Sequence, residues 1–480
     1  MANDSRLFFI VLAVGASLGI GNLLAFTYLK FDFSGIFFIP YLIALLILGV
    51  PLLLLEFSTA QYFNRNVIDL FASIRKWFSS IGWLMIINSF ILMCIYAAVF
   101  SWHVIYFFAS FGTQWSQNPR NYFFSNVLQA SDGFKSFINL SLPVFIALII
   151  AWALVFFYIR KGYEGIKKKF FATLAVFFAL SLLFLFYSLT LDNALAGIYS
   201  LIKLNFSGFL DLNLWIAAFS LAIMSLGVSF GLMNVFARKD GKGFAAANSF
   251  IVVAFEFIFA IVIGFILFAM LGFLNGKGLI DSSLELNNYG GLFVTLSQAL
   301  PFFYNPTISS MLFFIFLSIF FLLGASALAY SIAHVLVHKF NSKQIHASIL
   351  VCGIGFLFGL LFVIKPGFYI MDIMAHFIYY NILFALLLES IAVDWFFDSE
   401  KISAFINRYS SVKLCKIWRF MVRFIVPLIL MALIAFQIRS DLISRYGNYP
   451  LWALVVFGAG IVAVPLIAAF LLPQRILDRR

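Results

Sequence analysis

Long apolar runs recur from one end of this chain to the other, and they limit its fold more than any other feature. A helix needs about 20 mostly apolar residues to cross roughly 30 Å of hydrocarbon, and many of these runs are that long. Of the 480 residues, 64% are hydrophobic and 10% are charged, whereas a soluble domain carries about 25% charged residues. The runs are continuous rather than alternating, which argues against a membrane β-barrel. The sequence therefore predicts an all-α polytopic membrane protein.

The runs predict twelve transmembrane helices. The expected spans are 7–29, 36–60, 78–112, 137–159, 168–190, 212–237, 245–274, 309–338, 346–365, 370–397, 419–438 and 450–472. Most of the 31 Lys and Arg residues fall in segments on the same side as the N-terminus. By the positive-inside rule, both termini are then cytoplasmic. The net charge of +12 is thus a topology signal, and we expect no binding to nucleic acid.

Several other classes of protein lack support in the sequence. The three cysteines predict no disulfide framework, and the scattered histidines have no metal-ligand spacing. A phosphate-binding glycine loop with a lysine is missing, so an ATP-driven pump is not indicated. No nucleophile–base pattern points to an enzyme. The start MANDSR lacks a basic region, so the first span is expected to be retained rather than cleaved.

Two spans carry similar interruptions. Residues 14–26, VGASLGIGNLLAF, hold Gly15, Gly19, Gly21 and Asn22. The tripeptide Ser-Leu-Gly at 17–19 in this segment recurs at 225–227, within residues 215–236. These are spans one and six, the first members of two five-span sets, and an odd number inverts the second set. Glycine-interrupted spans at matching places in inverted halves point to the binding site of a secondary transporter. The alternative is that both are packing glycines at helix crossings.

The sequences around these interruptions resemble a known family. RLFFIVLAVGASLGIGNLLAF and FIPYLIALLILGVPLLLLEF lie within residues 6–63, and WIAAFSLAIMSLGVSFG is followed by RKD. They are similar to the neurotransmitter:sodium symporter family, which has the LeuT fold. The resemblance, which weakens toward span ten, implies one transporter domain over 1–480. It comprises inverted repeats at 1–205 and 206–398, with spans one and six broken, and two extra helices in 399–480.

The function implied by this resemblance is sodium-coupled import of an amino acid by alternating access. Na⁺ would be the coupling ion and no organic cofactor would be needed. The chain would be a bacterial member in the inner membrane, and a monomer and a homodimer both stay open. Two other functions are also left open, namely proton-coupled transport and a non-transporting sensor or leak pathway of the same fold.

The resemblance also implies a substrate site and two sodium sites. The substrate site would comprise Ser17, Ile20, Gly21, Leu92, Tyr96, Met224, Ser225, Gly227, Phe230, Ser326 and Tyr330. The first sodium site would comprise Ser17, Asn22, Ser225 and Glu256, and the second Gly15, Leu18, Leu322 and Ser326. Hard oxygen ligands suit an alkali cation. The side-chain pocket is apolar, which favours a hydrophobic or aromatic amino acid.

Buried acidic residues raise separate hypotheses. Glu256 lies in an apolar span, where a carboxylate is a functional candidate. We interpret it as a Na⁺ ligand, with a proton carrier or a fixed charge replacing chloride as alternatives. Glu56 resembles the family glutamate that ties span two to the broken sixth helix, which is structural support. Glu389 and Asp394 fall near a helix end, which favours a solvated role.

The chain departs from the family pattern at its gates. Ala25 replaces the usual outer arginine, and the partner aspartate position falls on Ala375, with Asp372 one turn earlier. The joint loss of the arginine and the aspartate is electrostatically reasonable, since a single unpaired charge in the transport pathway would be destabilising. Leu221 replaces a frequent glutamine, and Ala325 replaces a hydroxyl or carboxyl of the second sodium site. The outer gate is therefore expected to be mostly apolar, with Tyr96 over Phe230.

Overall fold

The computed structural model of the chain describes residues 2–17, 34–130, 133–134, 137, 139–203, 206–238, 244–280, 289–410, 413 and 416–472. Within these residues every regular element is helical. Ten helices of the described part are long and apolar enough to cross a membrane. Two shorter apolar helices, Arg6–Ser17 and Leu212–Leu226, fall within the expected spans one and six. The all-α polytopic prediction is confirmed, whereas the count of twelve spans stays a prediction.

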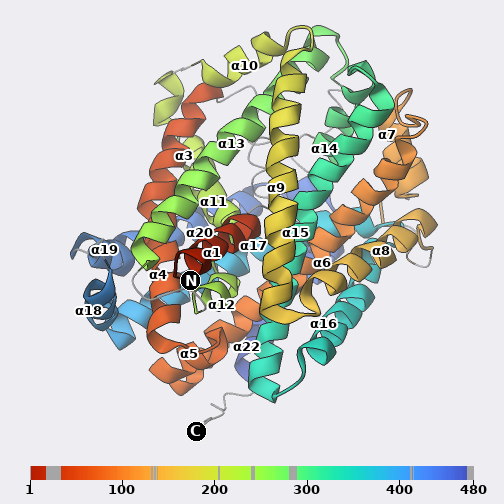
Figure 1. Cartoon of the computed structure of the whole chain (residues 1–480). Helices are drawn as coiled ribbons and strands as arrows, with labels where there is room; N and C mark the ends of the chain where they lie inside the picture. Colours follow the sequence, from red (N-terminus) through yellow and green to blue (C-terminus); the bar gives the residue numbers. More distant parts are fainter. Residues whose placement is uncertain are drawn as a thin grey trace.

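The first half of the chain begins with α1 and ends before the second interrupted span (Figure 1). Its main helices are α1 (Ala2–Ser17), α3 (Phe38–Ala44), α4 (Val50–Phe63), α5 (Val67–Ile74), α6 (Ser79–Ala109), α7 (Pro119–Asn121), α8 (Leu142–Ile159), α9 (Gly162–Leu189) and α10 (Ala194–Ile202). A π-helical segment, η2 (Leu45–Gly49), joins α3 to α4, so these form one span. Asn66 caps α5 by accepting a hydrogen bond from the Asp69 N–H at 3.1 Å, and this type of cap favours a helix start.

The second half of the chain contains the other interrupted span and the C-terminal helices. They are α11 (Leu212–Leu226), α12 (Leu232–Ala237), α13 (Ala245–Gly276), α14 (Tyr289–Ser297), α15 (Pro306–Phe340), α16 (Gln344–Gly359), α17 (Gly367–Ile391), α18 (Ser399–Tyr409), α19 (Lys416–Phe420), α20 (Val426–Ile443), α21 (Leu451–Ala453) and α22 (Gly460–Leu471). Helix α15 starts at Asn305, whose side chain accepts from the Ile308 N–H at 3.4 Å, with Pro306 in the first turn. Both residues favour a helix start.

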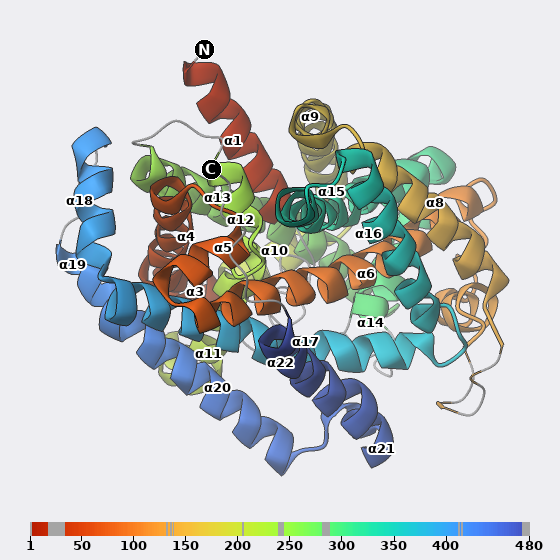
Figure 2. The ribbon, with the colours of Figure 1, turned by 90° about the horizontal axis from the view of Figure 1, so that it is seen from below.

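Helices α6 and α15 form the buried scaffold of the molecule. In Figure 2, α15 is seen nearly end-on while α6 runs across the view, so the two helices cross steeply. Their most apolar windows are 89% and 78% buried, the highest values among the long described helices. Their residues correspond to the third members of the two five-span sets that the sequence predicts. Helices α1, α11 and α12, which carry the ends of the interrupted spans, contact one another beside this scaffold.

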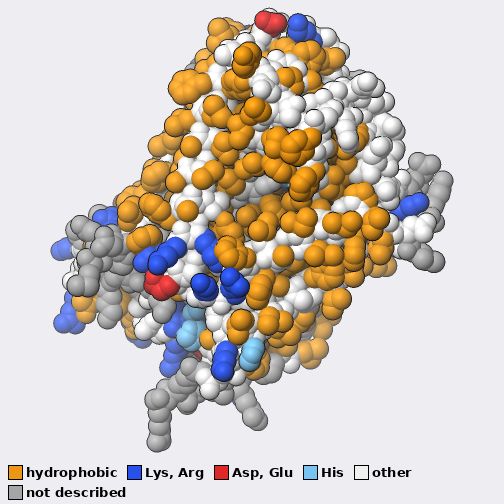
Figure 3. Space-filling model, turned by 45° about the vertical axis from the view of Figure 1, so that its right-hand side comes forward, with side chains coloured by type: hydrophobic (Ala, Val, Ile, Leu, Met, Phe, Trp, Pro, Cys, Tyr) orange, Lys and Arg blue, Asp and Glu red, His pale blue; other side chains and the backbone are white. Residues whose placement is uncertain are grey.

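The periphery of the molecule suits a lipid environment. The apolar windows of Lys416–Asn448 and Leu451–Leu471 are only 33% and 17% buried, and Figure 2 shows α20 and α22 outside α17. Apolar side chains cover most of the face in Figure 3, while Lys and Arg gather toward its lower part. An apolar belt bordered by basic residues is what a multi-pass membrane protein requires. The chain is thus a multi-pass membrane protein.

Candidate functional site

The sixth span is unwound between α11 and α12. Three residues of this break have positive φ angles, namely Gly227 (65°), Ser229 (72°) and Gly231 (61°). Glycine adopts this left-handed backbone easily, whereas a serine is strained there. Ser229 is held by a hydrogen bond of 2.5 Å from its N–H to Glu56 Oε1 of α4. A side chain of the second span therefore stabilises the unwound backbone of the break.

The scaffold helices satisfy a carbonyl that the break leaves free. The Phe230 carbonyl oxygen accepts hydrogen bonds from the Ser89 hydroxyl of α6 at 2.8 Å and the Ser331 hydroxyl of α15 at 3.4 Å. Unwound backbone at membrane depth is stable only where protein or a cavity supplies such partners. The two crossing helices thus hold the break from both sides.

The break in the sixth span faces the end of α1. A side chain added at Gly227 would start 3.4 Å from the Ala16 carbonyl oxygen and 3.8 Å from Ser17 Cα. The Ser17 hydroxyl donates to the Val14 carbonyl at 2.9 Å. The end of α1, where the first predicted interruption begins, therefore lies against the break in the sixth span. Four residues predicted to bind substrate or sodium lie outside the described residues: Leu18, Ile20, Gly21 and Asn22.

A buried oxygen cluster lies beside this junction. The Tyr41 hydroxyl of α3 is 3.1 Å from Ser225 Oγ, at the end of α11, and donates to Glu256 Oε1 of α13 at 3.2 Å. Ser225 and Glu256 are only 0% and 2% exposed. Sequence reasoning paired Ser225 with Glu256 but missed Tyr41, whose only signal was a phenol within an apolar run. The cluster carries one carboxyl and two hydroxyl oxygens, a ligand type that suits a hard cation.

Three of the four residues predicted for the second sodium site, Gly15, Leu322 and Ser326, lie on α1 and α15, which contact each other. A Cβ on Gly15 would approach Phe170 of α9 at 3.1 Å and Leu323 of α15 at 4.0 Å. Leu322 and Ser326 are buried one turn apart on α15. The Ser326 hydroxyl oxygen is buried and has no hydrogen-bond partner among the described residues. This unmet oxygen is a suitable ligand for a cation or a bound polar group.

The residues predicted to line the side-chain pocket come from α6, the end of α11, the break and α15. Leu92, Tyr96, Phe230 and Tyr330 are buried, and Met224 is half-buried. The Tyr96 ring packs edge-on against Phe321, with 5.9 Å between ring centroids. None of these pocket residues is charged, so the lining is apolar.

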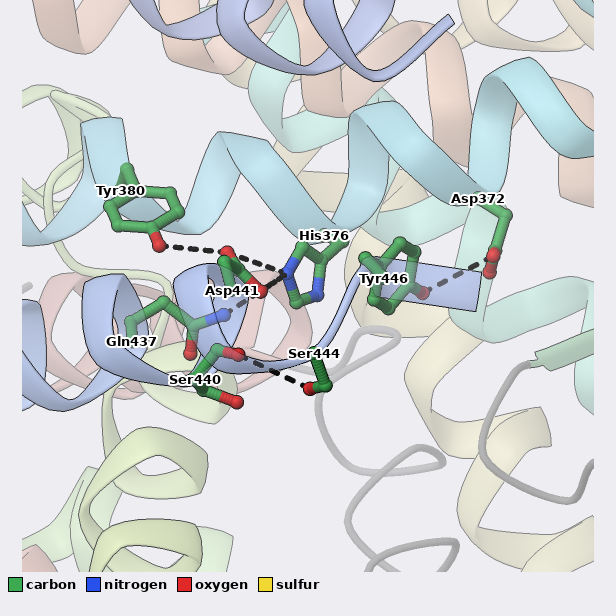
Figure 4. A network of polar contacts seen from close by, with 8 residues as sticks. All are labelled: Asp372, His376, Tyr380, Gln437, Ser440, Asp441, Ser444 and Tyr446. Atoms are coloured by element: carbon green, nitrogen blue, oxygen red, sulfur yellow. Dashed lines mark hydrogen bonds and ion pairs between the residues drawn. The ribbon is translucent and has the colours of Figure 1, made fainter. Parts of the chain in front are cut away.

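The N-terminal part of α17 is tied to the C-terminal segment of the chain. Asp372 accepts hydrogen bonds from Tyr446 at 3.2 Å and Tyr449 at 2.9 Å, in the turn before α21. Figure 4 shows the adjoining network, in which Asp441 of α20 accepts from His376 at 3.0 Å and from Tyr380 at 2.7 Å. Asp372 thus serves a contact between helices at the edge of the molecule.

Two polar contacts lie at the opposite end of the molecule. Arg6 of α1 donates to Asn248 Oδ1 of α13 at 3.0 Å, and its guanidinium lies 4.6 Å from the centroid of the Phe244 ring. Lys339 of α15 forms an ion pair of 3.2 Å with Asp69 of α5. These contacts join α1, α5, α13 and α15.

One expectation about acidic residues is wrong. Glu389 and Asp394 are 2% and 7% exposed rather than solvated. Asp394 forms an ion pair of 3.5 Å with Arg423 and accepts a hydrogen bond from Ser399. Glu389 faces a cavity that also contains Glu56. The sequence misled because the helix end it marked is covered by α5 and neighbouring helices, which only the tertiary structure decides.

Comparison with known proteins gives consistent matches. A family profile described as the sodium:neurotransmitter symporter family matches residues 2–119 and 113–476. An uncharacterised sodium-dependent transporter of Methanocaldococcus jannaschii is 28% identical over 98% of this chain and 97% of its own length. A human sodium-dependent neutral amino acid transporter is 22% identical over 96% of this chain and 78% of its own length.

A further relative is a sodium- and chloride-dependent GABA transporter of Drosophila melanogaster, 26% identical over 83% of this chain and 47% of its own length. The matches to the family profile span nearly the whole chain, and the end of α1 lies against the break in the sixth span. The chain therefore belongs to the sodium:neurotransmitter symporter family of sodium-dependent transporters.

Proposed function

We propose that the protein is a sodium-coupled symporter that imports an amino acid by alternating access. The observation that carries this proposal is the cluster of Ser225, Tyr41 and Glu256 beside the break in the sixth span. A carboxylate and two hydroxyl groups supply hard oxygen ligands of the kind that an alkali cation such as Na⁺ prefers. Na⁺ and substrate would bind between spans one and six, and downhill Na⁺ entry would drive uptake.

The proposed first sodium site comprises Ser17, Asn22, Ser225 and Glu256, with Tyr41 as an additional group. The proposed second site comprises Gly15, Leu18, Leu322 and Ser326. Its support is the buried, unpaired hydroxyl oxygen of Ser326 among the described residues. Glu56 supports the break through its hydrogen bond to Ser229.

The proposed substrate is a hydrophobic or aromatic amino acid. Its carboxylate would meet the backbone N–H groups of Ile20 and Gly21 and the hydroxyl of Tyr96. Its side chain would lie against Leu92, Phe230 and Tyr330. The uncharged lining supports this choice, because a charged substrate side chain would lack a partner there. The neutral amino acid transporter among the relatives agrees with it.

We propose a bacterial inner-membrane location with both termini cytoplasmic. The basic residues at the lower part of Figure 3 support this orientation, because basic residues are enriched on the cytoplasmic side. The twelve spans would then form the two inverted repeats and the two extra helices.

Uptake into reconstituted vesicles tests the proposal. The purified protein is placed in vesicles and a panel of radiolabelled amino acids is presented with an inward Na⁺ gradient or with K⁺ in its place. Accumulation of at least one hydrophobic or aromatic amino acid only under the Na⁺ gradient is expected. Uptake of none across the panel contradicts symport, and flux independent of the gradient indicates a leak pathway.

Proton coupling through Glu256 is the second candidate. The hydrogen bond from Tyr41 places a hydroxyl beside the carboxyl group, as a proton carrier would require. Uptake driven by a pH gradient without Na⁺, and abolished by Glu256→Gln, would favour this alternative over sodium coupling.

A further inference from the structure

A small polar cavity lies between the break in the sixth span and α5. Its polar lining is Glu56 and Thr59 of α4, Asn234 of α12 and Glu389 of α17. Gly231 of the break and apolar side chains of α5 and α6 form the rest of the wall. This cavity is distinct from the cluster around Glu256, and neither proposed sodium site uses its residues.

Several polar atoms in the lining lack a partner. Glu56 Oε2, Glu389 Oε2 and both amide atoms of Asn234 are buried and form no hydrogen bond within the described part of the chain. The three side chains are only 2–3% exposed. An unmet buried polar atom is destabilising, and such atoms around one cavity therefore point to a ligand that satisfies them together.

The chemistry of the lining favours a small positive ligand. Among the described residues, neither glutamate forms an ion pair with a basic side chain, and the two carboxyl groups interact with each other electrostatically. The Thr59 hydroxyl donates to the Leu55 carbonyl at 2.8 Å, so only its lone pairs can face the cavity. Two carboxylates in one low-dielectric site repel each other, and one proton relieves that repulsion.

The two glutamates are not equivalent. Glu56 Oε1 accepts the Ser229 N–H at 2.5 Å, and a hydrogen bond of this kind stabilises the ionised carboxylate. Glu389 forms no hydrogen bond of this kind in the described part of the chain. We propose that Glu56 and Glu389 form a binding site for one exchangeable proton, which Glu389 Oε2 holds while Glu56 stays ionised.

The position of the site connects the proton to the break. Glu56 binds Ser229 of the break through one oxygen and faces the cavity with the other. A change of charge in the cavity therefore changes the electrostatic environment of the backbone that separates α11 from α12. The proposal of a proton site does not depend on the proposed function. Only the effect of the proton on transport rests on that function.

Helix α5 lies between the cavity and the surface of the protein. Val67 of α5 lines the cavity and lies against Gly231 of the break, where an added Cβ would be only 3.0 Å away. The residues that flank α5, Arg65 and Arg75, are exposed. The acidic residue of α5, Asp69, is paired with Lys339 and does not line the cavity. A displacement of α5 would thus give protons access to Glu389 from this surface.

Infrared difference spectroscopy of the purified full-length protein tests the proton site. The carbonyl stretch of a protonated carboxylic acid is followed during a pH titration in H₂O and D₂O, without substrate. The wild-type protein is expected to show one such band at neutral pH that disappears in Glu389→Gln. Glu389→Asp should keep a shifted band. In Glu56→Gln the band of Glu389 should disappear at a lower pH than in the wild type, because the negatively charged neighbour Glu56 is gone.

A matched control separates this site from the other buried carboxyl group. Glu256→Gln should leave the band in place, because that residue lies in the other cluster. A wild-type protein without the band, or a band that persists in Glu389→Gln, contradicts the proposal. The cavity could instead bind an alkali cation. In that case the infrared band would be absent, and thermal stabilisation by K⁺ or Na⁺ would be lost in Glu389→Gln and kept in Glu256→Gln. This outcome would also overturn the proposal.

The effect on the break has its own measurement. Stabilisation of the protein by Na⁺ should depend on pH in the wild type, and this dependence should be lost in Glu389→Gln at unchanged size-exclusion elution. A pH-independent wild type refutes the effect on the break. Failure of amino acid uptake would contradict the proposed symport but would leave the infrared result unchanged, so the two can be judged separately.

Discussion

Replacing Glu256 with Gln should greatly weaken Na⁺ binding. Glu256 Oε1 is 3.2 Å from the Tyr41 hydroxyl, which is 3.1 Å from Ser225 Oγ. A cation that interacts strongly with the carboxylate would lie within about 4 to 6 Å of it. At an effective dielectric constant of about 20, a unit charge at that distance contributes roughly 3 to 4 kcal/mol. Glutamine keeps the size and removes the charge, so a loss of roughly 100- to 1,000-fold in Na⁺ affinity is expected.

Thermal unfolding of the purified protein measures this loss without knowledge of the substrate. A Na⁺ concentration about 100 times the dissociation constant stabilises the wild type by about 2.7 kcal/mol. After a hundredfold loss of affinity, the same concentration gives only about 0.4 kcal/mol. The titration is carried out with choline replacing Na⁺ at constant ionic strength, so that screening does not change.

Two variants serve as controls for this experiment. Tyr41→Phe keeps the charge and removes one charge-assisted hydrogen bond, so a smaller loss of roughly 10-fold is expected. Asp441→Asn removes a carboxylate from the α17–α20 network and should leave Na⁺ affinity unchanged. If Glu256→Gln binds Na⁺ within threefold of the wild type, the carboxylate is not a sodium ligand and the reasoning is refuted.

Three further variants test how the helices are held. Gly197→Ala should strongly lower thermal stability, because its Cβ would lie 1.9 Å from a backbone carbonyl oxygen of α13. The control Gly353→Ala should not, because its Cβ would meet nothing within 4 Å. Equal unfolding midpoints for the two variants would contradict this reasoning. Glu56→Leu should be about 1–3 kcal/mol less stable than Glu56→Gln, because only leucine leaves the Ser229 N–H without an acceptor; chemical denaturation compares the two. Asp441→Leu should lower the unfolding midpoint by removing the acceptor for a histidine and a tyrosine of α17, and an unchanged midpoint would show that the network adds no stability.

The candidate site was predictable only in part. The repeated Ser-Leu-Gly tripeptide located the break at Gly227, because few residues other than glycine accept a positive φ angle. Ser225 and Glu256 were recognised through resemblance and through the rarity of a carboxylate in an apolar span. Tyr41 was missed, because a tyrosine in an apolar run is most often a packed residue, and nothing in the local sequence tells which helix its hydroxyl will face.

The sequence by itself determined the class of fold and the place where the sixth span is interrupted. Each of these follows from local chemistry, since runs of apolar residues must be helical in lipid and glycine permits unwound backbone. Only the tertiary structure decided which polar groups meet. Glu56 and Glu389 lie far apart in the chain but face one cavity, and Asp372 binds the tyrosines before α21. Such contacts depend on how helices pack across long separations, which no local pattern of residues encodes.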